Sequence, residues 1–223
     1  MAIYEIGLLS SIMESMGRRI IFLRHGKLEL PYESHDDMPF EVLRSLGTQT
    51  MDPPSDIAYL DSSTNHLRTL LNEFRFSTIF RSPSLRCSTL EQYIHSITPQ
   101  PIPPAEELEG LREIWFDLNK LFPSQNASVK DIAPKLIAGL LAGDPGIESV
   151  ENISRRLKDV TDHFPQSGDV LILTHGFLMR FIISTEKYSD SPKELTRAGW
   201  EAIPKFGYLE GFNVEEGKPL RYI

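Results

Sequence analysis

The feature that most constrains this chain is a short apolar run that ends in charged residues. Residues 20–23 read Ile-Ile-Phe-Leu, and Arg24, His25 and Gly26 follow at once. Such a run is typical of a buried strand in a parallel sheet. Ligands of open α/β sheets bind beyond the carboxyl ends of the strands. A histidine there can act as nucleophile, base or ligand, and an arginine beside it can hold an anion.

A second copy of this arrangement lies near the C-terminal end of the chain. Residues 170–173 read Val-Leu-Ile-Leu, and Thr174, His175 and Gly176 follow. Two parallel strands that end at the same edge of one sheet bring their histidines close together. The sequence therefore predicts that both imidazoles lie beside a single ligand.

A third apolar run, residues 78–80, leads into a segment suited to binding anions. Pro83 is at home in the first turn of a helix, which would place Ser82 near the N-cap and Arg86 about one turn inside. A guanidinium and a helix N-terminus both attract anions. With the two histidines and Arg24, these groups predict a phosphate pocket.

In this order, Arg24-His25-Gly26, Ser82-Pro83-x-x-Arg86 and Thr174-His175-Gly176 resemble the histidine phosphatase superfamily, the phosphoglycerate-mutase-like proteins. The resemblance implies an α/β fold, a three-layer αβα sandwich with a mostly parallel central sheet. It implies a single catalytic domain over residues 17–223, and residues 1–16 are then an N-terminal extension.

The resemblance also implies roles for individual residues. The phosphorylated residue would be His25, and Glu113 and His175 would complete the catalytic set. Phosphate would be bound by five groups that these motifs supply: Arg24, Arg86, His175, Gly26 and Ser82.

The acidic stretch before residue 114 offers two candidates for the proton donor, Glu113 and Glu107. Glu113 fits the family's Leu-x-Glu segment and precedes apolar residues that would bury its carboxyl and raise its pKa, as a general acid requires. Three other glutamates lie just before it, and Glu107 is the reserve candidate. The chain departs from the family where Asp117 replaces a glycine, and where Lys27 follows the first motif in place of a glutamate.

Composition excludes several other classes of protein. The chain has 223 residues, of which 40% are hydrophobic, enough for one globular core, and its net charge of −8 disfavours nucleic acids and anionic membranes as partners. One cysteine excludes an internal disulfide, and no apolar stretch is long enough to cross a membrane. We expect a cytoplasmic protein that acts on a phosphorylated small molecule and needs neither metal nor cofactor. The sequence leaves its oligomeric state open.

The rest of the chain predicts the surroundings of the pocket. Residues 31–56 indicate a long irregular loop that borders the pocket, and residues 103–117 a second bordering segment. Two amphipathic helices are expected over 128–142 and 148–164, and two closing strands over 200–203 and 208–214. Cys87 is expected to pack within its helix, because a cysteine phosphatase needs Cys-x5-Arg and Tyr93 stands at the arginine position.

Three other functions remain open at this point. A mutase needs a second anion subsite, and no basic Arg-Arg-Ser-Tyr segment supplies one. A metal hydrolase could use His25, His175 and a carboxylate as ligands, but two nearby arginines would repel the cation. A non-catalytic protein that binds a phosphorylated ligand is the third alternative, because of Asp117. The sequence does not identify the substrate.

Overall fold

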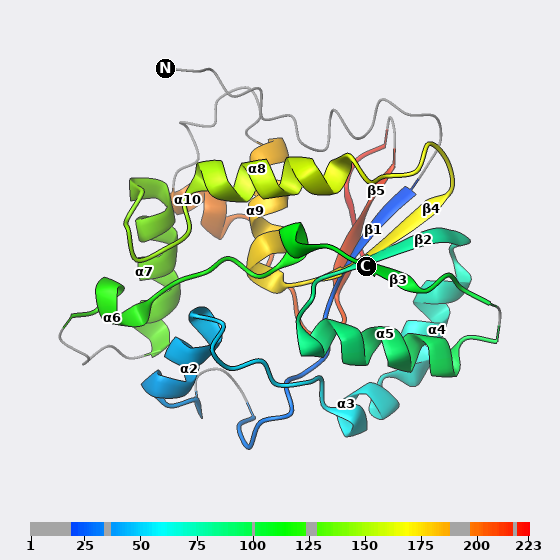
Figure 1. Cartoon of the computed structure of the whole chain (residues 1–223), viewed down its shortest axis with the longest axis horizontal. Helices are drawn as coiled ribbons and strands as arrows, with labels where there is room; N and C mark the ends of the chain where they lie inside the picture. The colour runs from blue at the N-terminus through cyan, green and yellow to red at the C-terminus, as the bar shows by residue number, and fades with distance from the viewer. Residues whose placement is uncertain (1–18, 34–36, 100, 124–128, 188–196, 216–217) are drawn as a thin grey trace.

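A computed structural model describes residues 19–33, 37–99, 101–123, 129–187, 197–215 and 218–223. The elements form three layers, with helices on both faces of a central sheet (Figure 1). This is the predicted α/β sandwich. The expected N-terminal extension, residues 1–16, lies outside the described residues.

Within the described residues, six strands form one sheet in the order β3-β2-β4-β1-β5-β6. The four strands β3, β2, β4 and β1 run parallel, whereas β5 is antiparallel to β1 and β6 is antiparallel to β5. The strands are β1 (Arg19–Arg24), β2 (Phe76–Arg81), β3 (Ala105–Glu107), β4 (Asp169–Thr174), β5 (Gly211–Glu215) and β6 (Arg221–Tyr222).

Side chains alternate along the central strands between two separate cores. On one face, Ile20 and Phe22 pack with residues of α2 (Phe40–Gly47), α6 (Leu118–Leu121), α7 (Val129–Ala142), α8 (Val150–Thr161), α9 (Gly176–Lys187) and α10 (Arg197–Glu201). On the other face, Ile21 and Leu23 pack with residues of α3 (Ile57–Ser62), α4 (Thr64–Asn72) and α5 (Leu85–Ile97). Burial on both faces explains the uninterrupted apolar runs.

Three sequence predictions need correction. The stretch 31–56 is not wholly irregular, because α2 occupies Phe40–Gly47 and buries Leu43. Residues 200–203 are not a strand: Trp200 belongs to α10 and is fully buried. The N-cap of α5 is Ser84 and not Ser82, so that Arg86 lies in the first turn of the helix.

The register of the two central strands places both histidines at one edge of the sheet. Arg24 pairs with Thr174, and the backbone N–H of His25 donates to the carbonyl of Thr174 at 3.0 Å. On the other side of β4, the N–H of Ser82 donates to the carbonyl of Leu173 at 3.0 Å. The three sequence motifs are therefore neighbours in space.

Candidate active site

His25 is buried at the end of β1, with only 5% of its surface exposed. Its Nδ1 donates to the carbonyl of Gly26 at 2.7 Å. This bond places the proton on Nδ1 and the lone pair on Nε2, the state that a histidine nucleophile needs.

His175 lies beside His25, with the two ring centroids 5.2 Å apart and the rings nearly perpendicular. Its Nδ1 accepts from the Nε–H of Arg86 at 3.1 Å, and its Nε2 lies 2.8 Å from the hydroxyl oxygen of Ser82. Since Nδ1 is an acceptor, the proton is on Nε2 and the ring is neutral. Burial lowers the pKa of His175 well below its usual value, and the positive charge of Arg86 lowers it further.

Arg86 is held between two partners at the N-terminus of α5. Its Nη1 forms an ion pair with Asp52 at 2.9 Å, while its Nε donates to His175. The other carboxylate oxygen of Asp52 accepts from the backbone N–H of Leu85 at 2.7 Å. Asp52 thus occupies the helix N-terminus that the sequence had assigned to an anion.

Glu113 is held by three backbone N–H groups, two of them in the first turn of α9. Leu178 and Ile114 donate to Oε1 at 2.9 and 3.0 Å, and Phe177 donates to Oε2 at 3.2 Å. Burial raises the pKa of Glu113, and these three donors together with Arg86 oppose that rise. This rise agrees with the prediction from the sequence that burial raises the pKa of Glu113, so that its carboxyl can hold a proton.

Arg156 of α8 holds the loop that carries Glu113. The guanidinium of Arg156 donates to the carbonyls of Gly110 and Arg112 and pairs with Glu148 at 2.9 Å. No motif pointed to Arg156. A basic residue on the amphipathic helix α8 was the only available signal.

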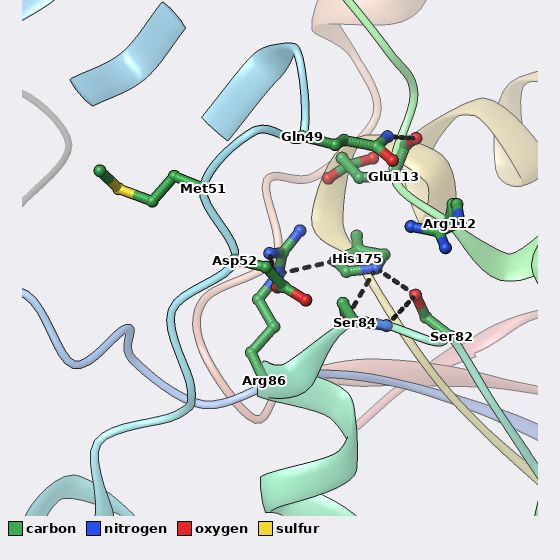
Figure 2. Close-up of a pocket in the computed structure, with 9 residues that line it drawn as sticks. All are labelled: Gln49, Met51, Asp52, Ser82, Ser84, Arg86, Arg112, Glu113 and His175. Carbon is green, nitrogen blue, oxygen red and sulfur yellow. Dashed lines mark hydrogen bonds and ion pairs between the residues drawn. The ribbon is translucent and has the colours of Figure 1, made fainter. Parts of the chain in front are cut away.

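A small cavity of about 40 Å³ lies beside His175, Arg86 and Glu113, and the side chains around it come from four parts of the chain (Figure 2). Arg24, His25 and Gly26 do not line it. The two segments predicted to border the pocket do border it. Its lining residues are Gln49, Met51, Asp52, Ser82, Ser84, Arg86, Arg112, Glu113 and His175. Among the predicted residues, Ser82, Arg86, Glu113 and His175 line this cavity.

The sequence reasoning missed five residues of the cavity lining, namely Gln49, Met51, Asp52, Ser84 and Arg112. Gln49 donates to the backbone carbonyl of Glu113 at 2.9 Å. The only signal for Gln49 and Asp52 was their place in a segment expected to border the pocket. The reserve candidate Glu107 pairs with Arg81 at 2.8 Å, is about half exposed and does not line the cavity.

Arg24 faces a second, larger cavity. Its Nη1 donates to the carbonyl of Phe206 at 2.5 Å, and its guanidinium stacks on the ring of Tyr208 at 4.3 Å. Burial lowers the pKa of Arg24, and the carboxyl of Glu113 partly offsets this. Arg24 lines a groove of about 280 Å³, and Glu113 lines both this groove and the small cavity.

Two properties of the described residues concern metal binding and membrane crossing. Among the described residues, no three His, Cys, Asp or Glu side chains are grouped so as to hold a metal ion. Nor does the described part of the chain contain a helix with the length and apolar character needed to cross a membrane.

Comparison with known proteins now defines the class. The family model of the histidine phosphatase superfamily (branch 1) matches residues 62–196, more than half of the chain, and so the chain belongs to this superfamily. The match begins after the first motif, and therefore does not include His25. No curated protein matches the chain in sequence.

Solved structures resemble this chain at low sequence identity. A phosphoglycerate mutase from Bacillus anthracis str. Sterne is 20% identical, with a TM-score of 0.58, over 95% of this chain and 93% of that one. A mycobacterial hydrolase is 17% identical, with a TM-score of 0.62, over 92% and 89%. A variant of phosphoserine phosphatase from Entamoeba histolytica, bound to phosphoserine, is 14% identical, with a TM-score of 0.55, over 92% and 94%. These neighbours show a phosphoglycerate-mutase-like fold.

Proposed function

We propose that this protein is a phosphatase that hydrolyses phosphate monoesters through a phosphohistidine intermediate on His25. One observation carries the proposal. The ring of His25 lies 5.2 Å from that of His175, and the bond from Nδ1 to the carbonyl of Gly26 leaves the lone pair of His25 on Nε2. A buried histidine in this tautomer, beside a guanidinium-bearing cavity, suits attack on phosphorus.

The phosphate would be stabilised by the positive groups around the two histidines. Arg86 offers the N–H groups of Nη2. Arg24 lies close enough to lower the pKa of His175 and to attract the carboxylate of Glu113. A bound dianion would also raise the pKa of His175, since an opposite charge favours the protonated ring. His175 would then donate to the phosphate through Nδ1 in place of accepting from Arg86.

The first chemical step transfers the phosphoryl group to His25. The lone pair on Nε2 attacks phosphorus, a P–N bond forms, and the bond between phosphorus and the ester oxygen breaks. Glu113 in its protonated form gives its proton to the departing oxygen, so that the product leaves as a neutral alcohol. The raised pKa of Glu113 favours the protonated form that this step requires.

The second step reverses the role of Glu113. Its carboxylate takes a proton from a water molecule, and the resulting oxygen nucleophile attacks phosphorus. The P–N bond breaks, the electron pair returns to Nε2 of His25, and inorganic phosphate leaves. No oxidant, metal or other co-reactant is needed to balance either step.

A panel of phosphorylated metabolites tests the proposal, with release of inorganic phosphate as the measurement. The native protein should release phosphate from at least one monoester, and His25→Ala should release none while keeping the native circular dichroism spectrum. His163→Ala is the matched control, because His163 is an exposed histidine on the surface. Isomerisation of 3-phosphoglycerate without net phosphate release would instead identify a mutase, and binding without turnover a non-catalytic protein.

A further inference from the structure

We infer that the groove beside Glu113 receives the alcohol part of the substrate, and that the preferred substrate is a phosphate monoester of an apolar alcohol without positive charge. The inference rests on the proposed function, because it assigns the leaving group of that reaction. It concerns the larger cavity, about 280 Å³, close to the lower end of the size range of small-molecule sites.

Glu113 joins the two cavities. Among the lining residues that the structure describes, Glu113 alone borders both the small cavity and the groove. A general acid must lie within hydrogen-bond reach of the leaving oxygen. With the phosphoryl group held near His175 and Arg86, the rest of the ester extends past Glu113 into the groove.

The lining of the groove is mainly apolar. Leu136 and Ile137 of α7 are buried, and Phe116, Phe177 and Phe206 add three aromatic rings, with Ala133 at an exposed position. Such a surface binds hydrocarbon better than it binds the hydroxyl groups of a sugar or of glycerol, because unpaired polar groups lose their bonds to water there.

The charges around the groove exclude a cationic alcohol. Arg24, Arg180 and Lys205 line it, and Glu113 is the only acidic residue among the lining residues that the structure describes. Arg180 is held in place by the carbonyls of Trp200 and Ile203 at 2.7 and 3.2 Å. A protonated amine on the leaving group would therefore meet three like charges.

Three monoesters of primary alcohols test the inference. They are 2-phenylethyl phosphate, glycerol 1-phosphate and 2-aminoethyl phosphate. We expect kcat/KM for the phenylethyl ester to exceed that for the glycerol ester by at least about tenfold, with the aminoethyl ester the poorest. Equal values, or a preference for either polar ester, would overturn the inference.

A variant in which a larger side chain fills the groove provides the second test. In Ala133→Trp the new side chain occupies the groove from an exposed position of α7, and kcat/KM for the phenylethyl ester should fall at least about tenfold, with a smaller fall for the smaller glycerol 1-phosphate. Ala138→Trp is the matched control, since Ala138 is exposed on the same helix and does not line the groove. Unfolding temperatures of both variants verify that they are folded.

The outcomes separate the two proposals. Phosphate release from these esters without a preference, or an unchanged kcat/KM for the phenylethyl ester in Ala133→Trp, refutes the groove assignment and leaves the phosphatase proposal standing. If neither these esters nor the metabolite panel releases phosphate, and no phosphate is trapped on His25, the phosphatase proposal itself fails.

Discussion

The Nε–H of Arg86 donates to Nδ1 of His175 at 3.1 Å, so the pocket of the unliganded protein contains a guanidinium cation and a neutral imidazole side by side. Burial and the positive charge of Arg86 lower the pKa of His175, which favours the neutral ring. Ser82 completes the arrangement by lying 2.8 Å from the other ring nitrogen.

The neutral state of His175 predicts a loss of stability in mild acid. Its pKa in the folded protein lies well below the usual 6.5, so below about pH 6.5 the unfolded chain binds a proton that the native protein does not. The free energy of unfolding should therefore decrease as the pH falls from 6.5 towards the folded pKa, by up to about 1.4 kcal/mol per pH unit. Urea unfolding between pH 5 and 8 measures this slope.

Variants assign the slope to one residue. His175→Asn should remove it, whereas His163→Asn, at an exposed site, should keep it. Inorganic phosphate at saturating concentration should also reduce the slope in the native protein, since the anion raises the pKa of His175. An unchanged slope in His175→Asn would contradict the neutral, buried state.

Arg86→Lys should weaken the site severely although the charge is kept. A lysine cannot bond to His175, Asp52 and a phosphate oxygen at once from one planar group. Hydrogen bonds that involve a charged group contribute roughly 1.5–3 kcal/mol, so kcat/KM should fall about tenfold to a hundredfold. Arg68→Lys on α4, outside the cavity, serves as the control, and equal losses in the two variants would argue against a phosphate-binding role.

Glu113→Gln tests the proton donor. The amide cannot give a proton to the leaving oxygen, so kcat for alkyl esters should fall about 10²–10⁴-fold. Because the first step needs protonated Glu113, kcat of the native protein should decrease as the pH rises above the pKa of this group, and the variant should lack that decrease. Glu107→Gln, which changes a carboxylate paired with Arg81, should leave kcat within about twofold.

Cys87 should be inert towards thiol reagents. The side chain is fully buried in α5, and burial raises the pKa of its thiol to about 11. Treatment of the native protein with iodoacetamide at pH 7.5 should leave Cys87 unmodified by mass spectrometry and the activity unchanged. Rapid alkylation with loss of activity would revive the reading of this segment as a thiol phosphatase.

Much of the fold could be predicted because strands that are buried on both faces must be apolar at every position. The runs at 20–23 and 170–173 are apolar on both faces, and the residues after them had to emerge at one edge of the sheet. The helix α2 was missed because its short apolar face lies among prolines and acidic residues. Trp200 was assigned to a strand, since a short apolar segment has no clear period of its own.

The site was predictable only where a motif marked it. His25, His175 and Arg86 each follow a strand, and strand order brought them together. Asp52 could not be foreseen, because its partner Arg86 lies 34 residues away and a loop sets their contact. The same holds for the groove, whose lining joins residues of α7 and α9 that are far apart in the sequence.

The most direct test of the central claim is to trap the phosphoryl group on the protein. A substrate labelled in its phosphate should be mixed with the protein, quenched in alkali, where phosphohistidine survives, and mapped by peptide mass spectrometry. We predict label on His25, and none in His25→Ala. Turnover with no label on His25, or label on another residue, would contradict the mechanism.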